Sequence, residues 1–156
     1  MVTSEKIITI QRPIDEVFAY VSDLQNSPQW QKGVVEARRM TDGPLGIGTQ
    51  FMDVRKYTGS RTLESAIQCT HYELNKKIVF KTISSSWPHE DIYQFESIDG
   101  GTRLTNRFEL QISGWMAMAG PLIALGLKGE MSANIGNLKA RLEKRTLKYT
   151  VNEQQP

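Results

Sequence analysis

The sequence is poor in the features that mark several common classes of protein. Its 156 residues include one cysteine, Cys69, so no disulfide can form within the chain, and a reducing, cytoplasmic environment is expected. The formal net charge of +2 is too small to indicate binding to nucleic acid or to an anionic membrane. The N-terminal stretch MVTSEKIITIQRP has an early acidic residue and no long apolar run, which argues against a signal peptide.

Signatures of catalytic and metal sites are also scarce. The two histidines, His71 and His89, are not at a local metal-ligand spacing, and neither a metal nor a cofactor is expected. Cys69 and His71 alternate on one predicted strand, but a buried thiol is favoured over a nucleophile and base pair. GPLGIG, residues 43–48, precedes a strand rather than a helix, so a turn is favoured over a phosphate-binding loop.

The stretch GWMAMAGPLIALGL, residues 114–127, carries no charge and is mostly apolar. A membrane span needs about 20 apolar residues, and this run ends at Lys128 and is interrupted by Pro121 and by glycines. No transmembrane segment is therefore expected. The stretch could instead fill the core, form a lid over a cavity, or make transient contact with a membrane surface.

The remaining sequence predicts a strand, two short helices, six strands and a long helix. Residues 5–12 are typical of a strand, a first helix follows Pro13, and Ser27 is expected to cap a second short helix carrying Trp30. The six later strands are separated by short turns and are expected at residues 34–41, 49–57, 61–72, 77–84, 90–97 and 102–112. Consecutive strands with such short connections must mostly pair antiparallel.

The last element is a helix expected from about Pro121 to Lys144. Its apolar residues recur at steps of three and four and form one stripe, which consists of Leu127, Met131, Ile135, Leu138 and Leu142. Small residues occupy the opposite face, namely Gly129, Ala133, Gly136 and Ala140. This small-residue face either is exposed to solvent or admits a close partner. The chain is thus expected to be one α+β domain over residues 1–148 with a polar tail over 149–156.

The hairpin around Asp99-Gly100-Gly101 predicts which side chains share a face of the sheet. A two-residue loop at either Asp99-Gly100 or Gly100-Gly101, or a four-residue loop, pairs odd residues of the preceding strand with even residues of the next. The inward set is then Asp91, Tyr93, Phe95, Leu104, Asn106, Phe108 and Leu110. The same alternation places Leu63, Ser65, Ile67, Cys69 and His71 inward, together with Ile78, Phe80 and Thr82. For residues 49–57 the alternation does not decide.

Several inward positions are polar, which is costly in a dry core because an unpaired buried polar group costs about 1–3 kcal/mol. A cavity with apolar walls and a few convergent polar groups would remove that cost and is typical of a small-molecule site. We predict apolar walls from Trp30, Phe80, Tyr93, Phe95, Phe108, Trp115, Met118 and Leu122. The expected polar anchors are Asn106, Asp91 and His89.

The chain resembles the START-like (SRPBCC, Bet v 1-like) superfamily, and within it the polyketide cyclase/dehydrase and lipid-transport group. The segments that carry the resemblance are IQRPIDEVFAYVSDLQNSPQW, GIGTQF, DIYQFESIDGGTRLTNRFEL and NLKARLEK, in this order over nearly the whole chain. The resemblance implies a helix-grip fold, in which a curved seven-stranded antiparallel sheet wraps around the C-terminal helix. It also implies a cavity between sheet and helix for a lipid, polyketide or aromatic metabolite.

The resemblance leaves the function open among three classes, because one fold can host many functions. The favoured hypothesis is a carrier or sensor of a hydrophobic or amphipathic small molecule. The alternative is a cyclase or dehydratase, for which Asp91 and His89 are the catalytic candidates because buried acid–base groups can transfer protons. A third is a module that binds a partner protein, similar to the activator-of-heat-shock-ATPase relatives. The sequence does not indicate an oligomeric state.

Overall fold

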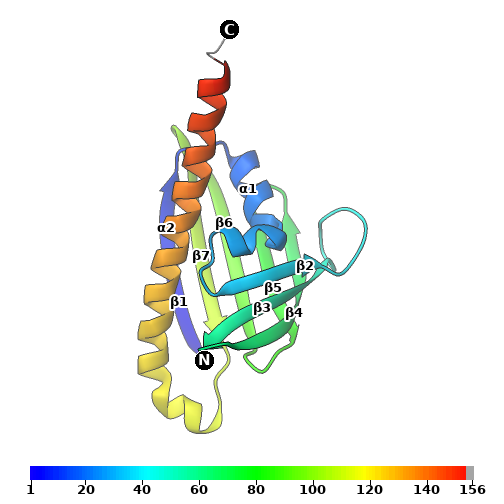
Figure 1. The fold of residues 1–156 in the computed structure, drawn as a ribbon, viewed down its shortest axis with the longest axis vertical. Coiled ribbons are helices and arrows are strands. Elements are labelled where there is room, and N and C mark those ends of the chain that lie inside the picture. The colour runs from blue at the N-terminus through cyan, green and yellow to red at the C-terminus, as the bar shows by residue number, and fades with distance from the viewer. Residues whose placement is uncertain (154–156) are drawn as a thin grey trace.

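A single antiparallel sheet of seven strands forms the body of the protein and curves around a long helix (Figure 1). The computed structural model describes residues 1–153, without the side chains of Tyr57, Thr58 and residues 145–153. The strand order across the sheet is β1-β7-β6-β5-β4-β3-β2. The strands are β1 (Val2–Ile10), β2 (Val34–Arg39), β3 (Gln50–Thr58), β4 (Arg61–Glu73), β5 (Lys77–Ser84), β6 (His89–Ile98) and β7 (Gly101–Leu110). This arrangement confirms the predicted α+β helix-grip fold.

Two short helices follow β1 and differ in detail from the prediction. Helix α1 (Ile14–Ser22) begins directly after Pro13, as expected. The second, η1 (Leu24–Gln29), is a 3₁₀ helix that starts earlier than predicted. Its first turn is capped by Asp23, whose Oδ1 accepts a hydrogen bond from the Gln25 backbone N–H, so the predicted cap at Ser27 is wrong. Trp30 follows the helix at its C-terminal end.

The long helix α2 (Gly120–Glu153) lies across the concave face of the sheet (Figure 1). A short 3₁₀ helix, η2 (Gly114–Ala119), connects β7 to it. The predicted stripe faces the sheet, since Met131, Ile135, Leu138 and Leu142 are buried. The small-residue face is exposed in the single chain, which is compatible with both alternatives. The helix continues past its predicted end at Lys144 through most of the segment expected as a tail, and residues 154–156 lie outside the described residues.

The closed core occupies one end of the curved sheet. There α1 packs on the sheet through Phe18, whose ring makes edge-on contacts with Phe95 and Tyr72 at centroid distances of 5.0 and 5.5 Å. Phe51 and Phe80 continue the aromatic cluster at 6.1 Å. The later turns of α2 cover this end, because Ile135, Leu138 and Leu142 belong to the same core. The opposite end of the sheet, under the first turns of α2, is left for a cavity.

The alternation of buried and exposed residues follows the predicted faces with one exception. The β6–β7 hairpin turns at Asp99-Gly100 and pairs Tyr93 with Asn106, which confirms the predicted pairing of odd with even residues. In β4, however, a bulge between Cys69 and His71 shifts the pairing with β5. The bulge turns His71 away from the interior, where its Nε2 lies 2.8 Å from Glu73 Oε1 at the surface. The predicted inward position of His71 is therefore wrong.

Candidate functional site: a cavity under the first turns of the long helix

A cavity of about 440 Å³ lies between the sheet and the first half of α2. Strands β3, β4, β6 and β7 supply its floor and walls, and the segment after η1 supplies one side. Helix α2 covers it with residues spaced three and one apart, so that they share one helical face: Ile123, Gly126, Leu127, Glu130, Met131 and Asn134. Gly126 has no side chain to fill the space, which leaves room beneath the helix. The volume is in the range typical of small-molecule sites, about 300–1,000 Å³.

The polar centre of the β6–β7 wall is Asp91. Its Oδ2 accepts a hydrogen bond from the Tyr93 hydroxyl at 2.7 Å, and its Oδ1 accepts one from Asn106 Nδ2 at 2.6 Å. Burial raises the pKa of the Asp91 carboxyl above its usual value, and the two hydrogen bonds oppose this rise by stabilising the carboxylate. Burial, followed by the neighbouring Asp91 charge, raises the pKa of Tyr93 well above its ordinary range, so Tyr93 acts as a hydrogen-bond donor.

His89 lies two residues before Asp91 on the same wall. Its Nδ1 lies 2.8 Å from the Trp87 carbonyl oxygen, and its ring packs 5.0 Å from that of Phe108. Burial lowers the pKa of His89 to about 4, with a smaller contribution from the Arg55 charge, so the imidazole is neutral at pH 7. A neutral imidazole bonded in this way presents an unprotonated Nε2 as a hydrogen-bond acceptor.

The opposite side of the cavity carries a charged group centred on Arg55 of β3. Arg55 Nε lies 3.2 Å from Asp53 Oδ2, and Nη2 donates to Gln31 Oε1 at 2.8 Å. A longer ion pair of 3.9 Å joins Nη1 to Glu130 on α2. Arg55 thus links the sheet, the segment after η1 and the helix. Burial raises the pKa of Asp53, and the Arg55 charge opposes that rise.

The structure brings together six of the eleven residues predicted for the site. The cavity is lined by Trp30, His89, Asp91, Tyr93, Asn106 and Phe108. Phe80 and Phe95 face inward but lie in the closed core, because α1 and neighbouring aromatic rings fill the space beside them. Trp115, Met118 and Leu122 lie outside the cavity and are exposed. Helical geometry explains the last of these, since Ile123, Gly126 and Leu127 occupy the inward face and Leu122 points elsewhere.

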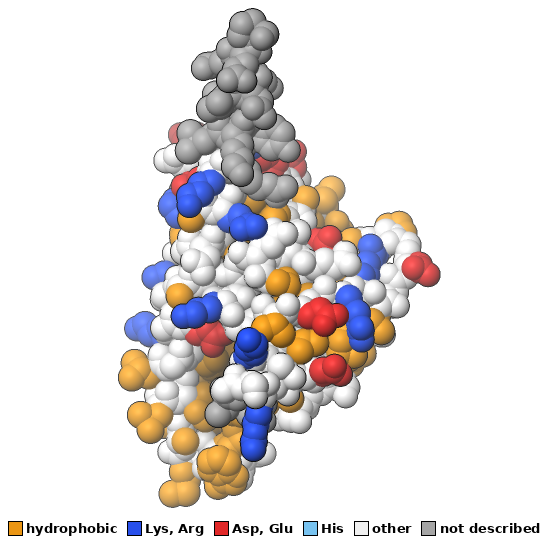
Figure 2. All heavy atoms as spheres, viewed as in Figure 1, with side chains coloured by type: hydrophobic (Ala, Val, Ile, Leu, Met, Phe, Trp, Pro, Cys, Tyr) orange, Lys and Arg blue, Asp and Glu red, His pale blue; other side chains and the backbone are white. Residues whose placement is uncertain are grey.

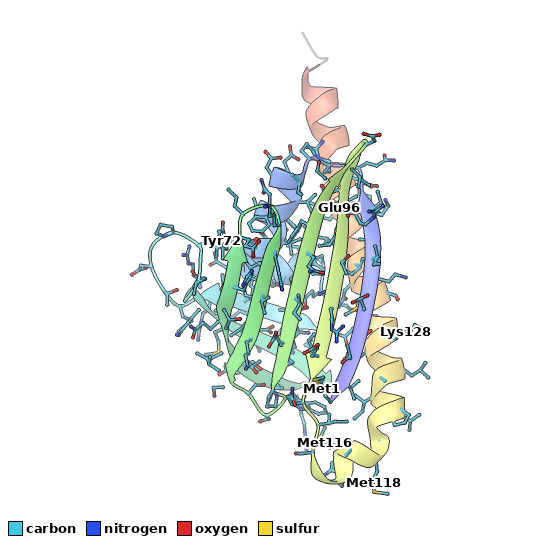
Figure 3. All side chains as sticks on the ribbon, turned by 180° about the vertical axis from the view of Figure 1, so that it is seen from behind. Met1, Tyr72, Glu96, Met116, Met118 and Lys128 are labelled. Atoms are coloured by element: carbon cyan, nitrogen blue, oxygen red, sulfur yellow. The ribbon has the colours of Figure 1, made fainter. Side chains whose placement is uncertain are left out.

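The uncharged stretch at residues 114–127 forms an exposed apolar tip beside the cavity. We define the apolar tip as Trp115, Met118, Leu122 and Leu125, whose side chains are 69–89% exposed. Figure 2 shows hydrophobic side chains gathered at this lower end of the molecule, and Figure 3 labels Met116 and Met118 there, with Lys128 further along α2. These four side chains do not fill the core, which removes that alternative for them. Among residues 1–153, no helix is long and apolar enough to cross a membrane.

Sequence reasoning missed much of the mouth of the cavity, which we define as the side that carries Arg55, Gln31, Glu130 and Asn134, where Arg55 and Glu130 are partly exposed. Arg55 and its partner Gln31 were not predicted, because alternation alone left the faces of β3 undecided. The structure turns Phe51 and Asp53 inward, and Arg55 follows at the same parity. The available signal was that Asp53 and Arg55 share a strand face with the aromatic residue Phe51. Trp87 and the polar residues of α2 that line the cavity were also missed, whereas Ser65 was predicted to face inward but not to belong to the site.

The structure does not bring together the residues that the other chemical alternatives require. Cys69 is buried in the core and does not line the cavity, and burial raises the pKa of its thiol, which disfavours the reactive thiolate. Its neighbour His71 faces the surface, so the two do not form a nucleophile and base pair. Among the side chains that the structure describes, no three histidine, cysteine or acidic groups converge to hold a metal ion.

Comparison with known proteins supplies relatives for this arrangement. The profile of a family described as polyketide cyclase/dehydrase and lipid transport matches residues 1–143. Among curated proteins, sequence comparison finds no significant match. The fold is similar to the di-domain ARO/CYC protein StfQ from the steffimycin biosynthetic pathway (TM-score 0.75, 17% identity), covering 93% of this chain and 51% of that one.

Two further solved structures have the same fold over nearly their whole length. A START superfamily protein from Mycobacterium smegmatis aligns with a TM-score of 0.73 and 15% identity, covering 91% of this chain and 97% of that one. The Zhui aromatase/cyclase from Streptomyces sp. R1128 aligns with a TM-score of 0.72 and 11% identity, covering 92% and 94%. At these identities the likeness establishes the fold alone.

Proposed function

Because the chain belongs to the polyketide cyclase/dehydrase and lipid-transport family, we propose that it binds a hydrophobic or amphipathic small molecule between its sheet and α2. The observation that carries the proposal is the cavity of about 440 Å³, which has aromatic and aliphatic walls and a few polar groups. A carrier or sensor requires a cavity of this kind and does not require catalytic groups. The ligand is a lipid, a polyketide or an aromatic metabolite.

The electrostatics of the cavity favour binding over acid–base catalysis. An efficient general base has a pKa near the working pH, and the low pKa of His89 makes its Nε2 a weak base at pH 7. Both carboxylate oxygens of Asp91 already accept hydrogen bonds from the protein. These contacts suit groups that orient a ligand, so we propose the carrier or sensor role ahead of the cyclase or dehydratase.

The proposal is tested by what the purified protein retains. Native mass spectrometry of freshly purified protein should show a fraction of molecules with added mass, and denaturing conditions should release a hydrophobic small molecule. In the variant Leu127→Trp, the larger side chain would occupy the cavity, and we expect the loaded fraction to fall by roughly tenfold, equivalent to about 1.4 kcal/mol of binding free energy.

The matched control is Ala133→Trp, which introduces a tryptophan at an exposed position of the same helix, away from both the cavity and the apolar tip. This control should retain the ligand as well as the wild type does. Equal retention in Leu127→Trp, or wild-type protein that is always empty, would contradict binding in this cavity.

The apolar tip supports collection of the ligand from a lipid surface. It is convex, lies beside the α2 residues that line the cavity, and sits within residues 111–127, which contain no charged side chain. A second copy is a poorer occupant, because four side chains supply less than the ~800 Å² per partner of a stable interface. Tryptophan, methionine and leucine suit the apolar boundary of a bilayer.

We expect the protein to co-sediment with vesicles of zwitterionic phosphatidylcholine. The triple substitution Trp115→Ser, Met118→Ser and Leu122→Ser should lower the bound fraction several-fold. Because the tip is uncharged, raising the salt concentration should leave wild-type binding nearly unchanged. Binding that needs anionic lipid and disappears with salt would locate the contact elsewhere.

A further inference from the structure

The wall formed by β6 and β7 faces the cavity with hydrogen-bond acceptors, and this pattern restricts the ligand. Among the side chains of β6 and β7 that line the cavity, every donor is already used inside the protein. The Tyr93 hydroxyl and Asn106 Nδ2 both donate to Asp91, and His89 Nδ1 donates to the Trp87 carbonyl. What remains toward the cavity is acceptor capacity, on His89, Asp91 and Asn106.

The orientation of the Asn106 amide is fixed by its neighbours. Its Nδ2 lies 2.6 Å from Asp91 Oδ1 and 3.3 Å from the backbone carbonyl oxygen of Ile92. The Ile92 carbonyl can only accept a hydrogen bond, so the nitrogen must point toward it and Asn106 Oδ1 must point away. No described group donates a hydrogen bond to Oδ1, and part of the surface of this atom is accessible in the cavity. It is therefore an acceptor available to a ligand.

The same reasoning fixes the state of His89. The Trp87 carbonyl can only accept, so the proton resides on Nδ1, and Nε2 has no partner among the described residues. Part of the Nε2 surface is accessible, and His89 lines the cavity although little of the residue is exposed. Two acceptors, His89 Nε2 and Asn106 Oδ1, thus flank the Asp91 carboxylate on one wall.

The mouth of the cavity has the opposite pattern. Gln31 Oε1 accepts from Arg55, and Asn134 Oδ1 accepts from the Lys32 backbone N–H at 3.0 Å. Arg55 and a backbone N–H can only donate, so both amides must turn their oxygen to these partners and leave their NH₂ groups available. The two amides at the mouth therefore offer donors, beside the Arg55–Glu130 ion pair, where the β6–β7 wall offers acceptors.

From this segregation we infer that the cavity selects an uncharged amphipathic molecule with a hydroxyl or other neutral hydrogen-bond donor at the β6–β7 end and a carbonyl oxygen at the mouth. This inference rests on the proposed function, since it assigns the ligand class of the same cavity. A carboxylate at the β6–β7 end would face the acceptors of His89, Asp91 and Asn106, which cannot compensate for its lost hydration. A hydroxyl replaces the water that those acceptors otherwise bind.

Three aromatic probes of similar shape test the inference: 6-acetyl-2-naphthol, its methyl ether 2-acetyl-6-methoxynaphthalene, and 2-acetylnaphthalene. Dissociation constants measured by calorimetry should favour the naphthol over both others by about tenfold, because only the naphthol donates to the acceptor wall. The unsubstituted ketone controls for the bulk of the methyl group. In His89→Phe, which removes one acceptor, the advantage of the naphthol should shrink several-fold.

The outcomes separate this inference from the proposed function. If the naphthol and 2-acetylnaphthalene bind equally, the inferred donor selectivity is wrong and the binding cavity stands. If none of the three probes binds the wild-type protein, this inference is overturned, whereas the proposed function is judged by the ligand retained in native mass spectrometry. The comparison among probes uses the wild-type chain, so it remains decisive even where the His89→Phe protein fails to fold.

Discussion

The substitution Leu138→Ala is expected to destabilise the protein by about 3 kcal/mol, within the 2–5 kcal/mol typical of a buried leucine replaced by alanine. Leu138 is fully buried at the centre of the α2 stripe and belongs to the closed core. Removing its side chain leaves a void in a region where surrounding rings and helices are packed and cannot collapse freely. Urea unfolding followed by circular dichroism measures the change in the free energy of unfolding.

The control for this prediction lies on the same helix. Leu125 is 69% exposed, so Leu125→Ala should change the free energy of unfolding by less than about 0.5 kcal/mol. Leu138 does not line the cavity, so the folded Leu138→Ala protein should keep its ligand. A Leu138→Ala protein as stable as the wild type would show that α2 does not hold the core as described.

A second large effect is expected from acid. The folded-state pKa of His89 is about 4, against an ordinary value of 6.5, so between these pH values the unfolded chain binds the proton and the folded chain does not. The contribution of His89 therefore favours the folded state fully above pH 6.5 and is lost as the pH falls toward 4. The shift corresponds to about 3 kcal/mol between pH 7 and pH 4.

Two carboxyl groups act in the opposite direction over an overlapping range. The pKa values of Asp53 and Asp91 are raised by burial, so the folded state binds protons more readily there and loses stability as pH rises through their titration. The useful quantity is therefore the difference in free energy of unfolding between the wild type and His89→Phe, measured from pH 7 to pH 4. This difference should change by about 3 kcal/mol in favour of the variant as pH falls. A difference independent of pH would show that His89 is not buried as a neutral imidazole.

Most of the architecture could be predicted from local patterns. Alternation on β6 and β7, joined to the two-residue turn at Asp99-Gly100, assigned the inward faces because a hairpin of known loop length has a fixed parity. The apolar stripe of α2 assigned the helix face in the same way. Both inferences depend only on neighbours in sequence.

The wrong or undecided predictions concern residues whose burial is set by a local irregularity of the backbone or by contacts distant in sequence. The bulge after Cys69 reverses the parity of His71, and no residue in that stretch marks it. The composition of residues 114–127 is equally compatible with core, lid or exposed tip, since their burial depends on how far α2 projects past the sheet. Phe80 and Phe95 were placed on the correct face but at the closed end, because alternation gives the face of a strand and not the position of a void.

The division of α2 into two parts has a consequence for how such chains can diverge. The turns from Ile135 to Leu142 supply the contacts on which folding depends, whereas those from Ile123 to Asn134 shape the cavity, with Met131 alone belonging to both. Substitutions in the earlier turns can therefore change which molecule the cavity binds with little effect on the free energy of unfolding. Within one helix, the earlier turns can thus vary with the ligand while the later turns maintain the fold.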